Sequence, residues 1–117
     1  MNIAIETTIR AYMEAARTGD PALMRAAFLS DATVRGSYGG KPVDWTLVEF
    51  CALIAKGGPA LELEAWIAAV EVSGTAAMAR LEAANWRGTR YTDFFVLLER
   101  DGKWRIASKV FFAHDRA

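Results

Sequence analysis

The sequence predicts an α+β fold in which helices come first and antiparallel strands follow, as a single domain over residues 1–117. Apolar residues recur at helical spacing up to about residue 57 and at a spacing of two after about residue 62. The dipeptides Ser73-Gly74, Arg87-Gly88 and Asp101-Gly102 separate the later apolar runs as hairpin turns do. A chain of 117 residues is long enough for one core and too short for two.

Three helices are expected in the first half of the chain. Apolar residues at helical spacing predict a first helix that ends at Gly19. Asp20-Pro21 starts a second helix, because aspartate caps a helix and proline suits its first position. We expect this helix to end at Ser30-Asp31. Thr46 opens a capping-box pattern before a third helix, which Gly57-Gly58-Pro59 ends.

The strands follow a spacing of two. A short strand is expected from Ala32 to Tyr38, and Gly39-Gly40 then turns the chain back. Four longer strands are expected at residues 62–72, 76–86, 89–100 and 103–113. Because the turns between these four strands are short, neighbouring strands should be antiparallel.

The last two strands are apolar on both faces. In the first of them, Tyr91, Phe95 and Leu97 alternate with Phe94, Val96 and Leu98. In the second, Trp104, Ile106, Val110 and Phe112 are expected to lie opposite Ala107, Phe111 and Ala113. Three helices cover only one face of such a sheet, which leaves an apolar patch on the other. We therefore expect a homodimer that pairs the outer sheet faces across a two-fold axis.

Composition excludes several classes of function. The formal net charge is zero, so no electrostatic footprint for nucleic acid or an anionic membrane is present. Cys51 is the only cysteine and His114 the only histidine, which excludes an internal disulfide and the usual zinc ligand sets. No signal-like segment or membrane-spanning run of roughly 20 apolar residues occurs. A cytoplasmic protein without metal, cofactor, nucleic-acid or membrane partner is expected.

Four segments of the chain resemble the nuclear transport factor 2-like superfamily. They are residues 12–20, 28–34, 92–95 and 101–106, with Lys109 and Phe111 after the last. The resemblance covers nearly the whole chain and is nearest to the putative lumazine-binding branch, largely bacterial proteins of unassigned activity. It implies a cystatin-like cone, in which three N-terminal helices pack on a strongly curved, mainly antiparallel sheet around an internal pocket. This fold hosts enzymes, binders and dimerisation modules, so the resemblance implies no particular reaction.

The superfamily includes ketosteroid isomerase, which this chain resembles distantly at two functional positions. Tyr12 matches the oxyanion-donating tyrosine of the isomerase, and Asp93 matches its protonated aspartic acid. The general base of the isomerase is an aspartate, and the residue in its place here is Gly36. Because loss of a general base costs a factor on the order of 10²–10⁴, steroid isomerase activity is not expected.

Asp93 and Tyr12 are the candidate catalytic residues. A carboxyl group in an apolar strand is costly unless it is protonated, paired or hydrated. Asp93 therefore marks either a site or a structural carboxylate satisfied by the backbone or by an arginine such as Arg80 or Arg90. Together with Tyr12 it could bind a carbonyl group or an oxyanion. The resemblance puts Lys109 on the pocket side, where it could hold an anionic group. The alternative for Lys109 is a lysine whose stem covers apolar surface.

Arg80 and Glu82 share one face of their strand. The other face carries only alanine and leucine, which suits a subunit contact, so we expect Arg80 and Glu82 to face the helices. A surface cross-strand pair is an equally good interpretation. The predicted ligand-binding residues are Tyr12, Trp45, Phe50, Arg80, Glu82, Trp86, Asp93, Phe95, Lys109 and Phe111.

Three functions remain open at this point. The favoured one is binding of a small, partly apolar ligand in the pocket by a homodimer, and the branch's name alone points to a pterin or lumazine. The second is a lyase or isomerase acting on a small carbonyl compound, with Tyr12 and Asp93 polarising the oxygen and Glu82, His114 or Asp93 moving the proton. The third is a ligand-free dimerisation or accessory module whose pocket is filled by aromatic side chains.

Overall fold

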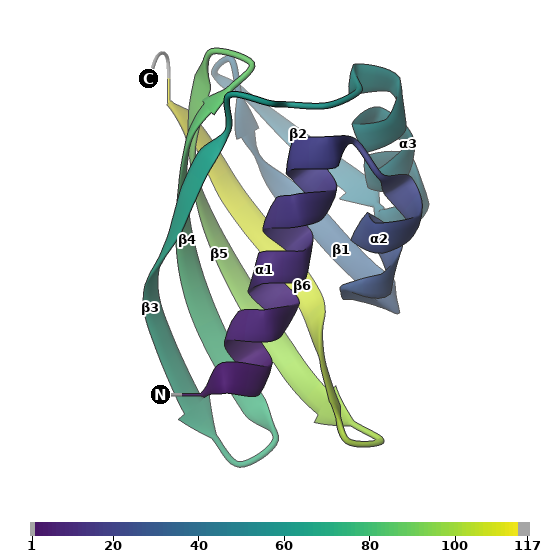
Figure 1. Ribbon diagram of the computed structural model, residues 1–117, viewed down its shortest axis with the longest axis vertical. Helices are drawn as coiled ribbons and strands as arrows, with labels where there is room; N and C mark the ends of the chain where they lie inside the picture. The colour runs from purple at the N-terminus through teal and green to yellow at the C-terminus, as the bar shows by residue number, and fades with distance from the viewer. Residues whose placement is uncertain (1, 115–117) are drawn as a thin grey trace.

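The computed structural model describes residues 2–114 as three helices and one curled, unclosed sheet of six strands. The helices are α1 (Ile3–Thr18), α2 (Pro21–Ala26) and α3 (Leu47–Gly57). The strands are β1 (Phe28–Tyr38), β2 (Lys41–Thr46), β3 (Glu64–Ser73), β4 (Ala76–Trp86), β5 (Thr89–Arg100) and β6 (Lys103–His114). The α+β prediction is confirmed, and the hairpin turns at Arg87-Gly88 and Asp101-Gly102 lie where predicted (Figure 1). The first turn, predicted at Ser73-Gly74, lies one residue later at Gly74-Thr75.

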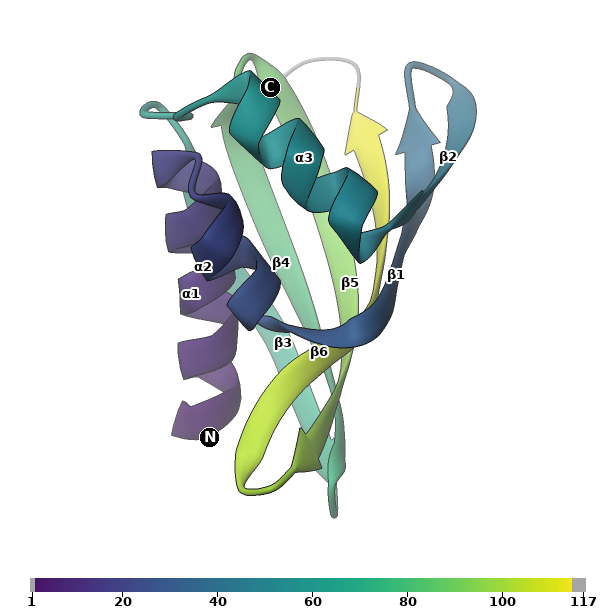
Figure 2. The ribbon, with the colours of Figure 1, turned by 90° about the vertical axis from the view of Figure 1, so that its right-hand side faces the viewer.

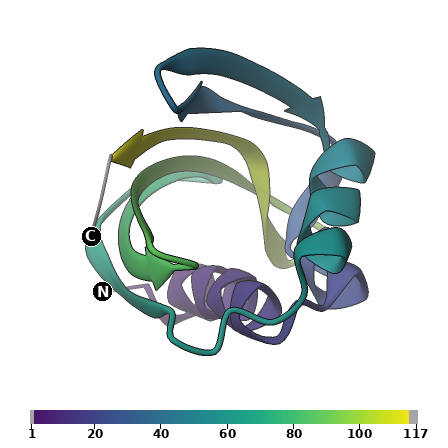
Figure 3. The same ribbon diagram turned by 90° about the horizontal axis from the view of Figure 1, so that it is seen from above.

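The sheet has the strand order β2-β1-β6-β5-β4-β3. Among the strands of residues 2–114, only β1 and β6 run parallel, and every other neighbouring pair is antiparallel. Viewed from above, the sheet curls around one side of α1, and α3 stands at its open side (Figure 3). Figure 2 shows α3 lying across one end of the strands, next to α2. The helices therefore cover the concave face of the sheet and leave the convex face uncovered.

Local capping sets the ends of the helices that frame the concave face. The Asn2 side chain accepts a hydrogen bond from the Ile5 amide at the start of α1, and α1 ends at Gly19 in the left-handed region with φ 70°. The predicted capping box of α3 is present. The Thr46 hydroxyl accepts from the Glu49 amide at 3.1 Å, and the Glu49 carboxylate accepts from the Thr46 amide at 2.8 Å.

The second helix is shorter than predicted, and the strand after it is longer. α2 ends at Ala26 instead of Ser30-Asp31, and β1 already begins at Phe28. Phe28 lies opposite Ile106 in the parallel pairing with β6, and the Ile106 amide donates to the carbonyl of the residue before Phe28 at 2.9 Å. Phe28 is buried, so pairing with a distant strand and burial in the core outweigh local helical preference.

A β-bulge decides which residues of β6 face the helices. The ladder between β5 and β6 skips Ala107, and one extra residue reverses the orientation of all that follow. Trp104 and Ile106 therefore share the concave face with Lys109 and Phe111, and all four are buried. Plain alternation had predicted Trp104 and Ile106 opposite Phe111, which is wrong. The bulge places Lys109 beneath the helices.

The convex face carries an apolar patch on β5 and β6, as the doubly apolar strands predicted. We call it the outer patch; it consists of Phe94, Val96, Val110 and Phe112, which are 47%, 50%, 50% and 52% exposed. Phe94 lies directly opposite Val110 in the ladder. Within residues 2–114, no helix is long and apolar enough to cross a membrane.

Candidate functional site

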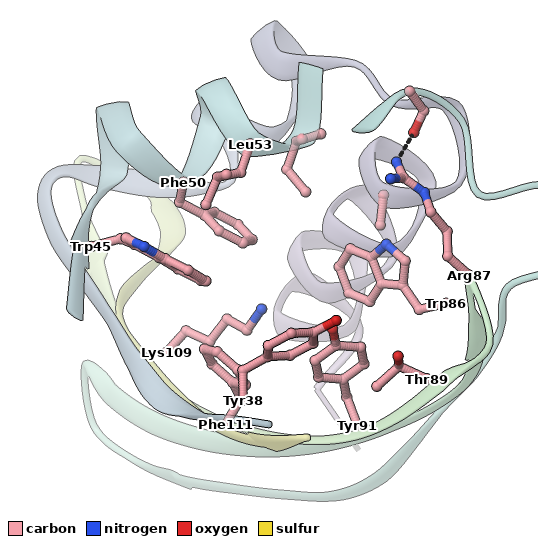
Figure 4. A pocket seen from close by; sticks show the side chains of 13 residues that line it. Tyr38, Trp45, Phe50, Leu53, Trp86, Arg87, Thr89, Tyr91, Lys109 and Phe111 are labelled. Carbon is pink, nitrogen blue, oxygen red and sulfur yellow. Dashed lines mark hydrogen bonds between the residues drawn. The ribbon is translucent and has the colours of Figure 1, made fainter. Parts of the chain in front are cut away.

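A cavity of about 340 Å³ lies between α3 and the concave face of the sheet (Figure 4). Six aromatic side chains form most of its wall: Tyr38, Trp45, Phe50, Trp86, Tyr91 and Phe111. The other lining residues are Ala16, Leu53, Ile54, Gly58, Arg87, Thr89 and Lys109. Pockets for small molecules usually begin at roughly 300 Å³ and are lined by apolar and aromatic groups with a few polar points. The cavity has this composition.

Flat aromatic surfaces line two sides of the cavity. The Trp45 ring is nearly parallel to Phe50 and to Phe111, with ring centroids 6.3 and 6.0 Å apart and interplanar angles of 21° and 19°. Tyr38 and Tyr91 are stacked at 6.5 Å and 16°. These surfaces suit a flat, partly apolar ring, because such a ring gains dispersion and stacking contacts on its faces.

Lys109 places a charged side chain inside this aromatic wall. It is 2% exposed, and its Nζ donates a hydrogen bond to the Tyr12 hydroxyl at 2.5 Å. Nζ also lies 5.0 Å from the ring centroid of Tyr12, 4.5 Å from Phe50, 5.4 Å from Trp86 and 4.9 Å from Phe111. Aromatic faces at these distances attract a cation, which partly replaces the hydration that Lys109 loses.

Tyr12 joins Lys109 to Asp93 beneath the cavity. The Tyr12 hydroxyl donates to Asp93 Oδ2 at 3.1 Å, and Lys109 Nζ lies 3.9 Å from the same oxygen. Asp93 is fully buried, and its other oxygen, Oδ1, has no hydrogen-bond partner among residues 2–114. A carboxylate with one unsatisfied oxygen is costly to bury, so the ionised form of Asp93 is only partly stabilised.

Burial shifts the pKa of each member of this cluster. It raises the pKa of Asp93, against the opposing effects of the Lys109 charge and the Tyr12 hydrogen bond. It lowers the pKa of Lys109, against the opposing charge of Asp93. Burial, and then the Asp93 charge, hold the pKa of Tyr12 well above its usual range. The pKa of the Asp93 carboxyl and the pKa of the Lys109 amine thus move towards each other. Tyr12 lies between the two groups.

The structure brings most of the predicted site residues together. Trp45, Phe50, Trp86, Lys109 and Phe111 line the cavity, and Tyr12, Asp93 and Phe95 form the layer beneath it. The ring centroids of Phe95 and Tyr12 are 5.0 Å apart, so Phe95 holds the Tyr12 ring in place rather than lining the cavity.

Arg80 and Glu82 lie on the convex face, away from the cavity, so the expectation that they face the helices is wrong. The small residues between and beside them, Ala79 and Leu81, pack in the core because a curled sheet leaves little room on its concave side. Glu82 accepts hydrogen bonds from Arg80, Arg90 and Thr92. Burial alone would raise the pKa of Glu82, but these hydrogen bonds outweigh it and lower the pKa.

The cavity also contains residues that sequence reasoning missed. Tyr38 and Tyr91 close one side, and alternation with Asp93 was a usable signal for Tyr91. Burial, followed by the neighbouring Tyr38 and Asp93, raises the pKa of Tyr91 to about 12. Arg87 was predicted only as a turn residue; it has φ 53°, lines the cavity and donates to the Gly58 carbonyl at 2.7 Å.

Three negative results concern His114, possible metal ligands and Gly36. His114 hydrogen-bonds with Thr92, whose hydroxyl donates to Glu82, so His114 lies with the polar group of the convex face and not in the cavity. Within residues 2–114, no group of three or more histidine, cysteine, aspartate or glutamate side chains is placed to hold a metal ion. At Gly36, a Cβ atom would collide with the Phe111 carbonyl and lie 2.6 Å from the Phe111 ring. The position that resembles the base of the isomerase therefore has no room for a side chain.

Three helices on a curled six-stranded sheet, with a cavity at its concave face, have the cystatin-like cone fold, and a 35%-identical relative shows that the chain is nuclear transport factor 2-like. The sequence model of the family described as "Putative lumazine-binding" matches residues 2–112, and the chain belongs to this family. The predicted resemblance is confirmed.

Three proteins that are similar to this chain carry different descriptions. A nuclear transport factor 2-like protein of unknown function from Methylobacillus flagellatus is 35% identical, with 97% of this chain and 95% of that chain covered and a TM-score of 0.91. The aldolase FrzH from Cladobotryum sp. is 25% identical over 114 residues, which cover 97% of this chain and 91% of that protein. A ketosteroid isomerase-like protein from Erwinia carotovora is 19% identical, covers 94% of this chain and 93% of its own, and has a TM-score of 0.72, which shows the shared fold alone.

Proposed function

We propose that this protein binds a small, partly apolar molecule with a polar oxygen, such as a carbonyl, in the cavity beneath α3. The observation that carries the proposal is Lys109, a buried amine aimed into a mostly aromatic cavity of about 340 Å³ (Figure 4). A buried polar group within a largely apolar pocket is the usual means by which a site orients a ligand. The aromatic side chains line this cavity without filling it, which argues against the ligand-free module.

The aromatic walls and Lys109 together specify the shape and polarity of the ligand. A flat ring between the Trp45 and Tyr91 sides would place an oxygen substituent at Lys109 Nζ. A hydrogen bond from a charged donor contributes about 1.5–3 kcal/mol. Lumazine, a flat bicyclic dione, has this chemistry, and the description of the family supports a ligand of this class.

The proposed assembly is a homodimer through the convex face. The outer patch, Phe94, Val96, Val110 and Phe112, leaves four large apolar side chains about half exposed on neighbouring strands. Contiguous apolar surface of this kind on a soluble domain marks an interaction site. A formal net charge of zero does little to oppose self-association.

A second candidate function is a lyase acting on a small carbonyl compound. The aldolase name of the 25%-identical relative, which aligns over nearly the whole chain, favours it. The cluster beneath the cavity also suits it, because Tyr12 and Asp93 can polarise an oxygen bound at Lys109. Gly36 offers no general base, so any proton would have to move through Lys109, Tyr12 and Asp93.

Native mass spectrometry of freshly purified protein, followed by denaturing extraction, tests the binding proposal. We expect a dimer with a reproducible small-molecule adduct, or binding of added lumazine by calorimetry where the protein purifies empty. The Lys109→Met variant should weaken binding by roughly 10–100-fold, the equivalent of one charged hydrogen bond. Lys56→Met, which removes an exposed lysine of α3, is the matched control and should bind as the wild type does. Equal binding by the Lys109→Met variant would contradict the proposal.

A further inference from the structure

The surroundings of Lys109 suit a reactive amine as well as a hydrogen-bond donor that holds a ligand. We propose that Lys109 Nζ forms a reversible Schiff base with the carbonyl carbon of an aldehyde or ketone bound in the cavity. This inference rests on the proposed function, because it needs a small carbonyl compound in the same cavity. It adds the substrate class and a covalent step that binding alone does not require.

The first support is the position of Nζ. Lys109 lines the cavity, its side chain is 3% exposed, and Figure 4 shows the nitrogen directed at the open space between Phe50 and Trp86. The remaining lysines, Lys41, Lys56 and Lys103, are all exposed. An amine in apolar surroundings loses the water that stabilises its charge, and the neutral amine is the form that attacks a carbonyl.

The second support is the aromatic enclosure, which fits the product as well as the free amine. A protonated Schiff base keeps a positive charge at the former Nζ position. The ring centroids of Phe50, Phe111, Tyr12 and Trp86 lie 4.5 to 5.4 Å from that position, and each ring presents a negative face. The site therefore stabilises the iminium cation without a fixed negative charge in the cavity itself.

The third support is a route for the protons that the reaction moves. Tyr12 Oη lies 2.5 Å from Lys109 Nζ and 3.1 Å from Asp93 Oδ2. If Asp93 is protonated and donates to Tyr12, and Tyr12 donates to Nζ, both hydrogen bonds are reversed and the amine is neutral. Burial raises the pKa of Asp93 and lowers that of Lys109, and both shifts favour the neutral forms of the two groups.

The step balances with these groups alone. The Nζ lone pair attacks the carbonyl carbon, a C–N bond forms, and the C=O π electrons move to oxygen. The oxygen takes up the proton that the nitrogen gives up, which yields a neutral carbinolamine. A second proton converts the hydroxyl group into water, which leaves while the nitrogen lone pair forms the C=N bond. One water is released, and the protonated Schiff base takes up one proton overall, which Asp93 can supply through Tyr12. No oxidant, reductant or further reactant is needed.

Reaction with acetylacetone tests the inference on the intact protein. A 1,3-diketone condenses with a neutral amine to a conjugated enaminone, which absorbs in the near ultraviolet where neither reactant does. We expect one enaminone per chain at neutral pH, and peptide mass spectrometry should locate it at Lys109. Lys109→Met should abolish it, whereas Lys56→Met, in which an exposed lysine is removed, should leave it unchanged.

Tyr12→Phe provides a test that does not remove the lysine. Loss of the phenol should slow enaminone formation at least tenfold while the final yield at Lys109 remains one per chain, a result that a purely structural role of Tyr12 would not give. Modification spread over Lys41, Lys56 and Lys103, or no enaminone at all, would overturn the inference. A protein that binds lumazine but forms no enaminone would refute the Schiff base and leave the proposed function standing. An enaminone at Lys109 without lumazine binding would support the Schiff base alone.

Discussion

Replacing Asp93 by alanine is expected to lower the free energy of unfolding by about 3–5 kcal/mol, because it leaves the Lys109 ammonium buried without its carboxylate. Urea denaturation followed by circular dichroism measures this change. Replacing both partners, Asp93→Leu with Lys109→Met, should recover most of the loss, since no charge then remains buried. Asp31→Ala, which removes an exposed aspartate of β1, should change stability by less than about 0.5 kcal/mol.

The single variants should also respond to pH in opposite directions. In Lys109→Met, Asp93 has a folded pKa above its unfolded value, so stability is greatest in acid and falls as pH rises through the raised pKa. In Asp93→Ala, Lys109 has a folded pKa below its unfolded value, so stability is greatest in alkali and falls as pH falls through the lowered pKa. Additive single losses with the same pH dependence would show that the two groups are not coupled.

Charging the outer patch is expected to convert a dimer into a monomer. Phe94→Lys with Val110→Glu places opposite charges on two residues that face each other in the ladder, so strand pairing within one subunit is maintained. In a dimer formed through the convex face, both charges would be buried. The free energy of association cannot compensate for the hydration that they would lose. Light scattering coupled to size-exclusion chromatography should report half the wild-type mass.

Leu61→Glu is the control for this change, because it charges an apolar residue that is 76% exposed but lies outside the outer patch. It should leave the mass unchanged. A wild-type protein that is a monomer at micromolar concentration, or a charged variant that stays dimeric, would contradict the proposed assembly.

Much of the fold could be predicted because its signals are local. The turn glycines, the capping box at Thr46 and the Asp20-Pro21 helix start each act within a few residues, and the structure has them where expected. The end of α2 could not be predicted in this way. It depends on the pairing of Phe28 with Ile106, far away in the sequence, and no local pattern encodes that contact.

The candidate site was predictable in part for the same reason. Asp93 was conspicuous because a carboxyl group interrupts an apolar strand, and Tyr12 and Lys109 followed from the resemblance. The faces of β4 and β6 were not predictable, since the bulge at Ala107 and the curl of the sheet determine them. The bulge puts Trp104 and Ile106 on the same face as Lys109, and the curl leaves Arg80 and Glu82 on the convex face.

The most direct test of a buried, reactive amine beneath the cavity is a pH titration of the lysine side chains by carbon-13 NMR. Selective labelling of the lysine Cε atoms gives a separate signal for each of the few lysines. The signal that disappears in the Lys109→Met variant is that of Lys109. The expected result is a Lys109 pKa clearly below the ordinary value of a lysine side chain, with a shift of the same signal on addition of a carbonyl ligand. A Lys109 signal that titrates in the ordinary range of a lysine side chain and does not respond to ligand would contradict a buried amine at the centre of the site.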